Sequence, residues 1–288
     1  MTSPRSATWL VTGGSGQLGS EVVRALGGGS GTVVAPTAAE LDITDAAAVR
    51  SFVVDLRPDV LVSCAAYTAV DDAESDAEAA TALNAEAPRH LAQACADVGA
   101  RMLQVSTDYV FSGDAHEPYA EDAPTGPRTV YGRTKLAGEA AVLEVLPDSA
   151  YVVRTAWLYG RGGSNFVRTM LRLAEHRPTL DVVDDQWGQP TSARDLAERI
   201  VELVESAGPA GVYHGTNAGA TTWNGFAREV FRLSGLDPER IRPTTSDAFV
   251  RPAPRPAYSV LGHDRWAFAG LGPMRPWQDA LAAALPLD

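Results

Sequence analysis

The sequence predicts an α/β fold, in which a doubly wound parallel sheet carries helices on both faces and a smaller C-terminal lobe follows. Three observations predict it. Short, almost continuous apolar runs alternate with helical stretches through residues 1–160, a pattern typical of parallel strands buried on both faces. A glycine-rich turn joins the first run to the first helical stretch. Beyond Gly160 the alternation ends, because proline and glycine become frequent there.

The elements of the first half follow from apolar periodicity and from helix start and stop signals. Thr44 is the expected N-cap of the second helix, and three glycines at 27–29 end the first helix. The expected strands cover residues 7–12, 32–35, 60–64, 101–106 and 151–154, and the expected helices cover 17–26, 45–56, 76–98 and 130–146.

The second half predicts a separate, smaller unit. We expect residues 1–160 to form a first domain and residues 161–288 a lobe that faces the ligand. One segment, 186–208, contains an expected helix over Ala193–Glu205 and is expected to return to the first domain. Residues 242–256 hold too many prolines for regular structure.

The composition of the chain limits the classes of partner that the protein can bind. The formal net charge is -12, which argues against nucleic acid and anionic membranes, since both require clustered Lys and Arg. A site for an anionic ligand must therefore carry its own cations. No apolar run is long enough to span a membrane, and residues 1–7 contain no stretch typical of a signal peptide. With only Cys64 and Cys95 and no disulfide framework, the sequence predicts a cytoplasmic protein.

The glycine-rich turn predicts a dinucleotide site. Glycines here permit a tight turn and close approach to a pyrophosphate, while the following helix presents free N–H groups and a partial positive charge. A plain glycine turn is the alternative, but the position between first strand and first helix favours the dinucleotide. The cofactor-binding candidates in this turn are Gly13, Gly16, Gln17, Leu18 and Gly19.

The second expected strand bears on the choice of dinucleotide. Sites that prefer NAD usually place an acid about 20 residues after the glycine loop. Residues 35–38 (Ala-Pro-Thr-Ala) contain no acid to repel a 2′-phosphate and no Arg to bind one. We expect NADPH, with NADH as the alternative. Asp42 and Ile43 are expected near the adenine, although Asp42 is equally a candidate helix-entry residue.

Tyr131 and Lys135 are candidates for carbonyl reduction, because four-residue spacing places them on one helix face. Reduction needs a proton donor beside the oxygen. A lysine ammonium at about 4 Å favours the phenolate by up to roughly 4 kcal/mol at an effective dielectric of 20, which would strengthen Tyr131 as an acid. Thr107 ends the fourth strand, where ligands bind in parallel sheets, and its hydroxyl can orient the substrate oxygen. A structural role for Thr107 and a chance Tyr–Lys pair are the alternatives.

At these residues the chain resembles the extended short-chain dehydrogenases with their Rossmann sheet, and within them the dTDP-4-dehydrorhamnose reductase family. The similarity covers almost the whole chain. It is carried by the G-x-x-G-x-x-G loop and by the segments 65–71, 106–111, 131–139, 154–160, 165–166, 185–191, 221–223 and 255–261.

The resemblance implies NAD(P)H as hydride donor and the 4-keto group of a thymidine-diphosphate deoxysugar as substrate. It implies Thr107, Tyr131 and Lys135 as the catalytic set, with Ala65 and Ala66 against the cofactor. Arg255 is the candidate for the diphosphate, where guanidinium groups suit bidentate contacts, and Arg251 is either a second contact or a solvated surface residue. The other substrate-binding candidates are Thr68, Tyr109, Trp157 and Asn165.

A difference from the related dehydratases, a departure from the family's pattern and two alternative functions accompany the resemblance. The related dehydratases have Asp-Glu after the strand-end Thr, whereas Asp108 here is followed by Tyr109, which favours reduction over elimination. Some relatives form dimers through a magnesium ion held by C-terminal glutamates, but the tail here is nearly free of acids; we expect a monomer or homodimer. The alternative functions are a non-catalytic dinucleotide-binding regulatory subunit and an NAD-dependent sugar-nucleotide epimerase.

Metal catalysis has little support in the sequence. The five histidines and two cysteines show no metal-ligand spacing. The acidic run 71–78 leads into an expected helix, where acids favour the helix dipole and are usually solvated. We expect no metal.

Overall fold

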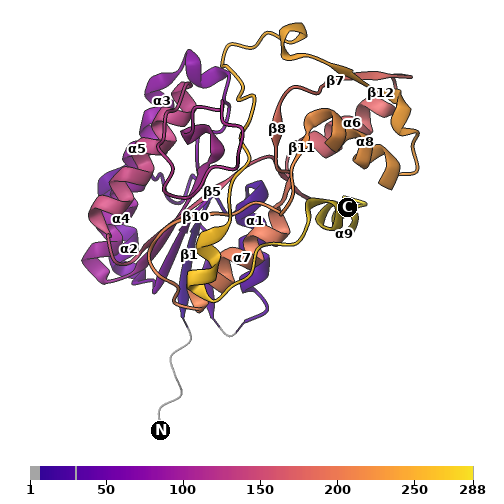
Figure 1. Cartoon of the computed structure of the whole chain (residues 1–288). Coiled ribbons are helices and arrows are strands. Elements are labelled where there is room, and N and C mark those ends of the chain that lie inside the picture. The colour runs from indigo at the N-terminus through magenta and orange to yellow at the C-terminus, as the bar shows by residue number, and fades with distance from the viewer. Residues whose placement is uncertain (1–6, 30, 288) are drawn as a thin grey trace.

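A six-stranded parallel sheet forms the centre of the first domain in the computed structural model, which describes residues 7–29 and 31–287 (Figure 1). The strand order is β10-β5-β4-β3-β1-β2, and every neighbouring pair is parallel. The strands are β1 (Thr8–Thr12), β2 (Thr32–Val34), β3 (Val60–Ser63), β4 (Arg101–Thr107), β5 (Ala150–Thr155) and β10 (Gly211–His214).

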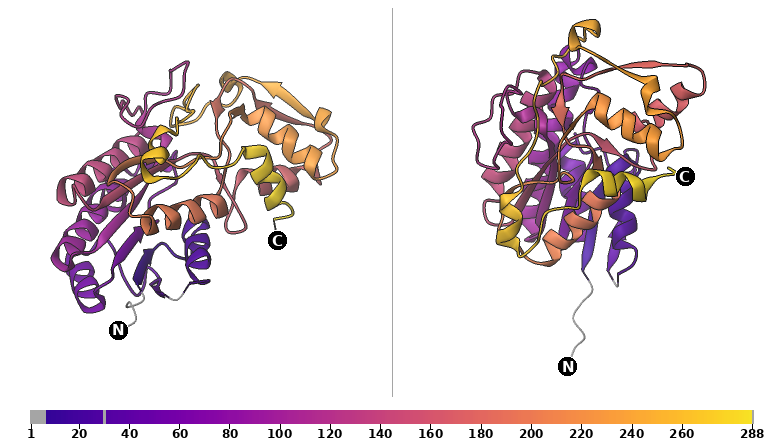
Figure 2. Two further views of the ribbon diagram at one scale, coloured as in Figure 1. Left: turned by 60° about the horizontal axis from the view of Figure 1, so that its bottom comes forward. Right: turned by 45° about the vertical axis from the view of Figure 1, so that its right-hand side comes forward.

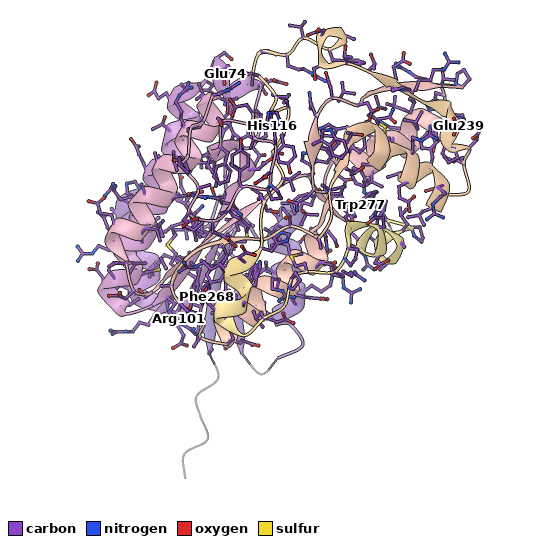
Figure 3. All side chains as sticks on the ribbon, viewed as in Figure 1. Glu74, Arg101, His116, Glu239, Phe268 and Trp277 are labelled. Atoms are coloured by element: carbon purple, nitrogen blue, oxygen red, sulfur yellow. The ribbon has the colours of Figure 1, made fainter. Side chains whose placement is uncertain are left out.

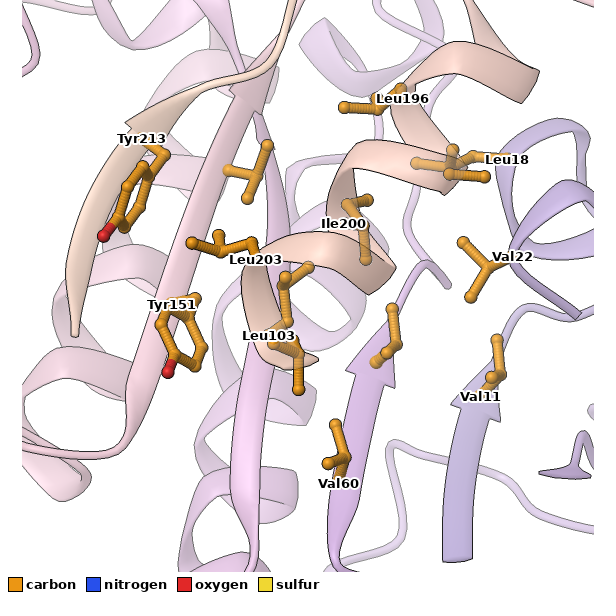
Figure 4. Packing of buried hydrophobic residues seen from close by; sticks show 14 of the residues in the cluster. Val11, Leu18, Val22, Val60, Leu103, Tyr151, Leu196, Ile200, Leu203 and Tyr213 are labelled. Atoms are coloured by element: carbon orange, nitrogen blue, oxygen red, sulfur yellow. The ribbon is translucent and has the colours of Figure 1, made fainter. Parts of the chain in front are cut away.

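Helices cover both faces of this sheet, which confirms the predicted fold class. One face carries α1 (Gln17–Leu26) and α7 (Ala193–Glu205), and the other carries α2 (Ala46–Leu56), α4 (Ala87–Val98) and α5 (Val130–Val145). Figure 4 shows Leu18 and Ile200 of the first pair packed over Val11, Val60 and Leu103 of the strands. Each of these five side chains is at most 7% exposed, and such burial contributes roughly 1.5–3 kcal/mol per side chain.

The smaller lobe lies beside the sheet and has its own core (Figure 2). It contains α6 (Phe166–Ala174), α8 (Trp223–Leu233), α9 (Trp277–Ala284) and the parallel pair β7 (Leu180–Val183) and β12 (Ile241–Thr244). Two further short pairs are β6 (Leu158–Tyr159) with β9 (Thr191–Ser192), and β8 (Trp187–Gly188) with β11 (Thr221–Thr222).

The expectation that 242–256 lacks regular structure is wrong at its start. Residues 242–244 belong to β12, and Pro243 is paired opposite Val182. Proline is tolerated there because β12 has a strand partner on one side only. The rest of the segment holds the short turn η5 (Ser246–Ala248), and η4 (Pro238–Arg240) precedes the strand.

Segments of the second half return to the sheet. Helix α7 packs beside α1. Strand β10 is an edge strand of the sheet, and the turn η6 (Asp264–Ala269) packs on it, although both fall outside the expected returning segment 186–208. Trp266 of η6 is 1% exposed and its indole N–H donates to the His214 carbonyl at 2.8 Å.

Two helix predictions need correction. Asp45, not Thr44, caps α2, because its side chain accepts from the N–H groups of Ala47 and Ala48. The helix expected over 76–98 is divided into α3 (Ala77–Thr81), a π-helical turn η2 (Ala82–Glu86) and α4. Within η2 the buried Asn84 side chain both accepts from and donates to the backbone of Tyr67, which fixes the segment after β3 against the helix.

The described residues contain no helix long and apolar enough to cross a membrane. The signal-peptide expectation concerns residues 1–7, of which 1–6 lie outside the described residues.

Candidate active site

A cleft of about 1000 Å³ opens at the C-terminal ends of β1, β3 and β4 and extends to the lobe. Figure 3 shows the two ends of the sheet domain: Arg101 marks the start of β4, and Glu74 lies at the opposite end. Glu74, in the turn η1 (Asp72–Glu74), accepts from the Val130 N–H at 2.8 Å. It thereby fixes the first turn of α5, which carries the tyrosine–lysine pair.

The glycine loop allows its own backbone segments to approach each other closely and leaves room for a pyrophosphate. Gly13 has φ 70°, and a Cβ on Gly19 would lie 2.1 Å from the Gly13 carbonyl oxygen. Helix α1 begins after Gly16 with no side-chain cap and no acid in its first turn. Its first N–H groups therefore face the cleft without a competing carboxylate, which suits a pyrophosphate. Gly13, Gly16, Gln17, Leu18 and Gly19 all line the cleft, as do Ala65 and Ala66.

Replacing Gly19 by alanine should displace this loop, because the new Cβ would collide with backbone rather than with a flexible side chain. We expect the NADPH dissociation constant to rise at least about tenfold, equivalent to roughly 1.4 kcal/mol. Fluorescence titration with NADPH measures it. Gly28→Ala is the matched control, since no atom lies within 4 Å of a Cβ placed there. Equal affinity in both variants would contradict the assignment of this loop.

The end of β2 lies beside the glycine loop, because a Cβ on Gly14 would be 2.8 Å from the Ala35 side chain. Asp42 and Ile43, expected near the adenine, do not line the cleft. Asp42 is exposed and accepts hydrogen bonds from the backbone and hydroxyl of Thr44. Ile43 is buried at 7% exposure in the core below. The structure thus places Asp42 in the turn that enters α2.

Thr107, Tyr131 and Lys135 all line the cleft. Helix α5 starts beside them because the Thr129 hydroxyl caps it by accepting from the Gly132 N–H. Gly132 is required here, since a Cβ would lie 2.3 Å from the Tyr109 carbonyl oxygen. The tyrosine ring meets the Tyr109 ring edge-on, with centroids 5.6 Å apart.

The Lys135 ammonium donates to the Val105 carbonyl at 2.7 Å. The expected electrostatic effect of Lys135 on Tyr131 stays a prediction. Burial raises the pKa of Tyr131 to about 12, although a hydrogen bond with Thr107 opposes this. Tyr131 therefore stays protonated at neutral pH.

Lys135 is itself buried, at 4% exposure. Burial lowers the pKa of its ammonium to about 8, while the Glu139 carboxylate opposes the decrease. Glu139 accepts from the Arg154 guanidinium through three contacts of 2.7–3.2 Å and from the Ser106 hydroxyl at 2.5 Å. A buried ion pair, Glu139 with Arg154, therefore influences the charge of Lys135.

Four of the five substrate-binding candidates line the cleft: Thr68, Tyr109, Trp157 and Arg255. Asn165 does not. Its amide caps α6 through the Arg168 N–H and donates to the Gly160 carbonyl, so it holds the backbone beside the cleft.

Trp157 takes a left-handed backbone conformation, with φ 48°. Its indole stacks on Trp223 with ring centroids 3.6 Å apart. A side chain at Gly188 would collide with this indole, since a Cβ there would lie 2.5 Å from it. The lobe thus holds a fixed aromatic surface against the cleft.

Arg255 forms an ion pair with Asp71 at 2.8 Å, and Arg251 lies 3.8 Å from the same carboxylate. Burial alone would raise the pKa of Asp71, but the hydrogen bonds from Arg255 and the Ala253 N–H lower it, together with both guanidinium charges. This pair ties the loop after η5 to the first domain and aims both arginines at the cleft.

We expect Asp71→Asn to loosen this loop. The pair is about one-quarter exposed, so the loss should correspond to roughly 0.5–1 kcal/mol, a two- to fivefold rise in KM for a nucleotide-sugar substrate. Steady-state kinetics measure it, with KM for NADPH as the internal control. An unchanged substrate KM would show that the Asp71 contact does not prepare Arg255 for an anion.

Sequence reasoning missed several residues of the site. Cleft-lining residues not predicted include Asp108, Ser106, Gln186, Trp223 and Phe249. Asp108 follows the strand-end threonine directly, so its position was a usable signal. Trp223 and Phe249 come from the lobe, where no periodicity indicated which aromatic residues face the ligand.

Among the described residues, no group of His, Cys, Asp or Glu is arranged to hold a metal ion. His214 is buried and His263 is half-buried, and desolvation lowers their pKa values to about 3 and about 4, so both are neutral.

Comparison with known proteins gives the following relatives. A family described as the RmlD substrate binding domain matches residues 7–287. The dTDP-4-dehydrorhamnose reductase of Streptomyces griseus is 60% identical over 282 residues, covering 96% of this chain and 93% of the relative. The dTDP-4-keto-6-deoxy-D-glucose reductase of Streptomyces niveus is 53% identical over 279 residues, covering 97% and 96%.

A solved structure is also closely similar. The dTDP-4-dehydrorhamnose reductase of Bacillus anthracis, in complex with NADP, superposes with a TM-score of 0.93 at 36% identity, covering 97% of this chain and 98% of that chain.

Proposed function

The chain belongs to the dTDP-4-dehydrorhamnose reductase family, and from this premise we propose that its natural substrate is dTDP-4-dehydrorhamnose. The protein is an NADPH-dependent ketoreductase of dTDP-sugars, as the relatives at 53–60% identity support. The observation that carries the proposal is that the glycine loop and Thr107, Tyr131 and Lys135 line one cleft.

NADPH supplies the hydride when bound. The open N-terminus of α1 and the Gly13–Gly19 contact fit its pyrophosphate, and residues 35–38 place no acid beside its ribose phosphate. We assign Tyr131 as the proton donor to the carbonyl oxygen, with Thr107 beside it and Lys135 holding positive charge. Arg255 is assigned to the diphosphate, and Thr68, Tyr109 and Trp157 to the sugar side of the cleft.

The test is to mix the wild-type protein with NADPH and the proposed substrate, dTDP-4-keto-6-deoxy-L-mannose (dTDP-4-dehydrorhamnose) generated in situ, and to measure the loss of NADPH absorbance. Rapid oxidation that requires the sugar supports the proposal. The D-gluco and L-manno keto-sugars should be compared in parallel, because one relative acts on dTDP-4-keto-6-deoxy-D-glucose. If only the D-gluco compound is reduced, the rhamnose assignment fails and a secondary-metabolite sugar replaces it.

Two alternatives have weaker support. A non-catalytic binding subunit would leave NADPH bound but unoxidised with every keto-sugar. An epimerase would retain NAD through purification. The intact Thr107, Tyr131 and Lys135 in the cleft favour turnover over the first.

The remaining proposals concern the cellular compartment, the oligomeric state and the domain boundaries. We place the enzyme in the cytoplasm, where its thiols Cys64 and Cys95 stay free as they are here. We keep a monomer or homodimer as the oligomeric state, and size-exclusion chromatography with light scattering measures it. For the domains, we keep residues 1–160 with 186–208 as the dinucleotide-binding domain, extended by β10 and η6, and the remainder of 161–288 as the substrate-binding lobe.

A further inference from the structure

Arg161 is a cation near the glycine loop that the reduction described above does not use. It belongs to the Arg161 loop (residues 160–164), which joins β6 to α6. Its side chain is exposed, and within residues 7–29 and 31–287 its guanidinium group forms no ion pair and no hydrogen bond. A guanidinium group carries five N–H donors, so all five are available to a ligand.

The Arg161 loop packs against the first turn of α1. A Cβ on Gly160 would lie 3.8 Å from the side chain of Gln17, and a Cβ on Gly162 would lie 3.7 Å from Cα of Gln17. Arg161 stands between these two glycines. Ser164, at the end of the loop, lines the cleft together with Gln17. Arg161 is therefore attached beside the helix end at which the glycine loop receives a pyrophosphate.

The backbone of the loop is held in place at this arginine. The Gly160 carbonyl accepts from the Asn165 amide at 2.9 Å, and the Arg161 carbonyl accepts from the Arg168 guanidinium at 2.6 Å. Asn165 caps α6 and Arg168 lies in its first turn. These contacts fix the position of the Arg161 backbone next to α1 and leave its side chain to reach the ligand.

The other cations of the cleft already have partners. The chain has a net charge of -12, so a site for a doubly charged pyrophosphate must supply its own positive groups. Of the described residues that line the cleft, three are Lys or Arg: Lys135, Arg251 and Arg255. Lys135 donates to the Val105 carbonyl, and both arginines lie on the Asp71 carboxylate. Arg161 adds a cation without such a partner, beside α1.

We propose that Arg161 binds the pyrophosphate of NADPH, as a cation that complements the N–H groups of the first turn of α1. A guanidinium group forms bidentate hydrogen bonds with phosphate oxygens, and the open helix N-terminus presents N–H groups to the same oxygens. The inference deepens the proposed function, because it adds a residue to the cofactor site on which that function depends.

Arg161→Gln is the informative variant, since glutamine keeps a polar side chain but removes the charge. We expect the NADPH dissociation constant, measured by fluorescence titration, to rise about fivefold to tenfold. Arg161→Lys keeps the charge but loses the bidentate contact, so its affinity should lie between those of wild type and Arg161→Gln. The matched control is Arg177→Gln, because Arg177 is also exposed and also forms no ion pair among the described residues. It should bind NADPH as wild type does.

A series of ligands identifies the phosphate group that Arg161 contacts. NADH has the same pyrophosphate but no 2′-phosphate, so Arg161→Gln should weaken NADH and NADPH by the same factor. The affinity for dTDP should be unchanged, because its diphosphate is assigned to Arg255. The factor should shrink in about 1 M salt, where charge interactions are screened within a few ångströms.

An NADPH dissociation constant within about twofold of wild type would overturn the proposal. A loss confined to NADPH would assign Arg161 to the 2′-phosphate, and a loss confined to dTDP would assign it to the substrate; either result also contradicts the proposal. Equal affinities of Arg161→Lys and Arg161→Gln would show that the positive charge is not what binds. If wild type binds NADPH but reduces no keto-sugar, the proposed function fails, while the titrations still decide the role of Arg161.

Discussion

Replacing Tyr131 by phenylalanine should lower kcat by roughly 10²- to 10⁴-fold, the usual contribution of a positioned general acid. We propose that this phenol delivers a proton to a carbonyl oxygen in the cleft, and burial keeps it protonated by raising its pKa to about 12. Phenylalanine preserves the ring and its edge-on contact with Tyr109, so folding should be unaffected. Stopped-flow measurement of NADPH oxidation under single-turnover conditions isolates the chemical step.

The control for this substitution is Tyr258→Phe, which removes a phenol outside the cleft lining. It should retain the wild-type rate. NADPH affinity should be the same in both variants and in wild type, because no backbone of the glycine loop changes. A Tyr131→Phe protein that reduces the keto-sugar at more than about one-tenth of the wild-type rate would remove Tyr131 from the role of acid.

Local signals were sufficient for the first five strands of the sheet and for the glycine loop, but they did not predict the sixth strand, β10. A buried parallel strand appears in the sequence as an apolar run, and a close backbone approach requires glycine, so each feature can be recognised from one short segment. Glycine is needed at position 19 because a Cβ there would collide with Gly13. The spacing of Tyr131 and Lys135 likewise follows from one helix.

The features that the sequence could not predict depend on contacts between segments that are distant in the sequence. The π-helical turn at η2 forms where Asn84 bonds to Tyr67 and Thr134, residues 17 and 50 positions away. The position of the Lys135 ammonium depends on the Val105 carbonyl, 30 positions away. Helix spacing placed Lys135 beside Tyr131, but it could not reveal that the ammonium points to the backbone of β4.

Substitution in the Glu139–Arg154 pair should give the second large effect, because the pair contributes to the stability of the fold and Glu139 also raises the pKa of Lys135. Both side chains are at most 5% exposed. Glu139→Gln would leave the Arg154 guanidinium buried without its counter-charge, and breaking such a pair costs about 3–5 kcal/mol. Chemical denaturation should therefore show a lower free energy of unfolding. The same substitution removes the charge that opposes the decrease in the Lys135 pKa.

The pH dependence separates these two effects. Lys135 is charged below its pKa of about 8, so activity that needs the ammonium falls as the pH rises through that value. Without Glu139 the pKa falls further, and the alkaline limb of kcat/KM should move to lower pH. In the double variant Glu139→Gln with Arg154→Met no buried guanidinium is left unpaired, so much of the stability should return. The alkaline limb should stay displaced, because the carboxylate that supports the lysine is still absent. A double variant that restores both stability and the wild-type pH profile would show that Glu139 matters only as the partner of Arg154.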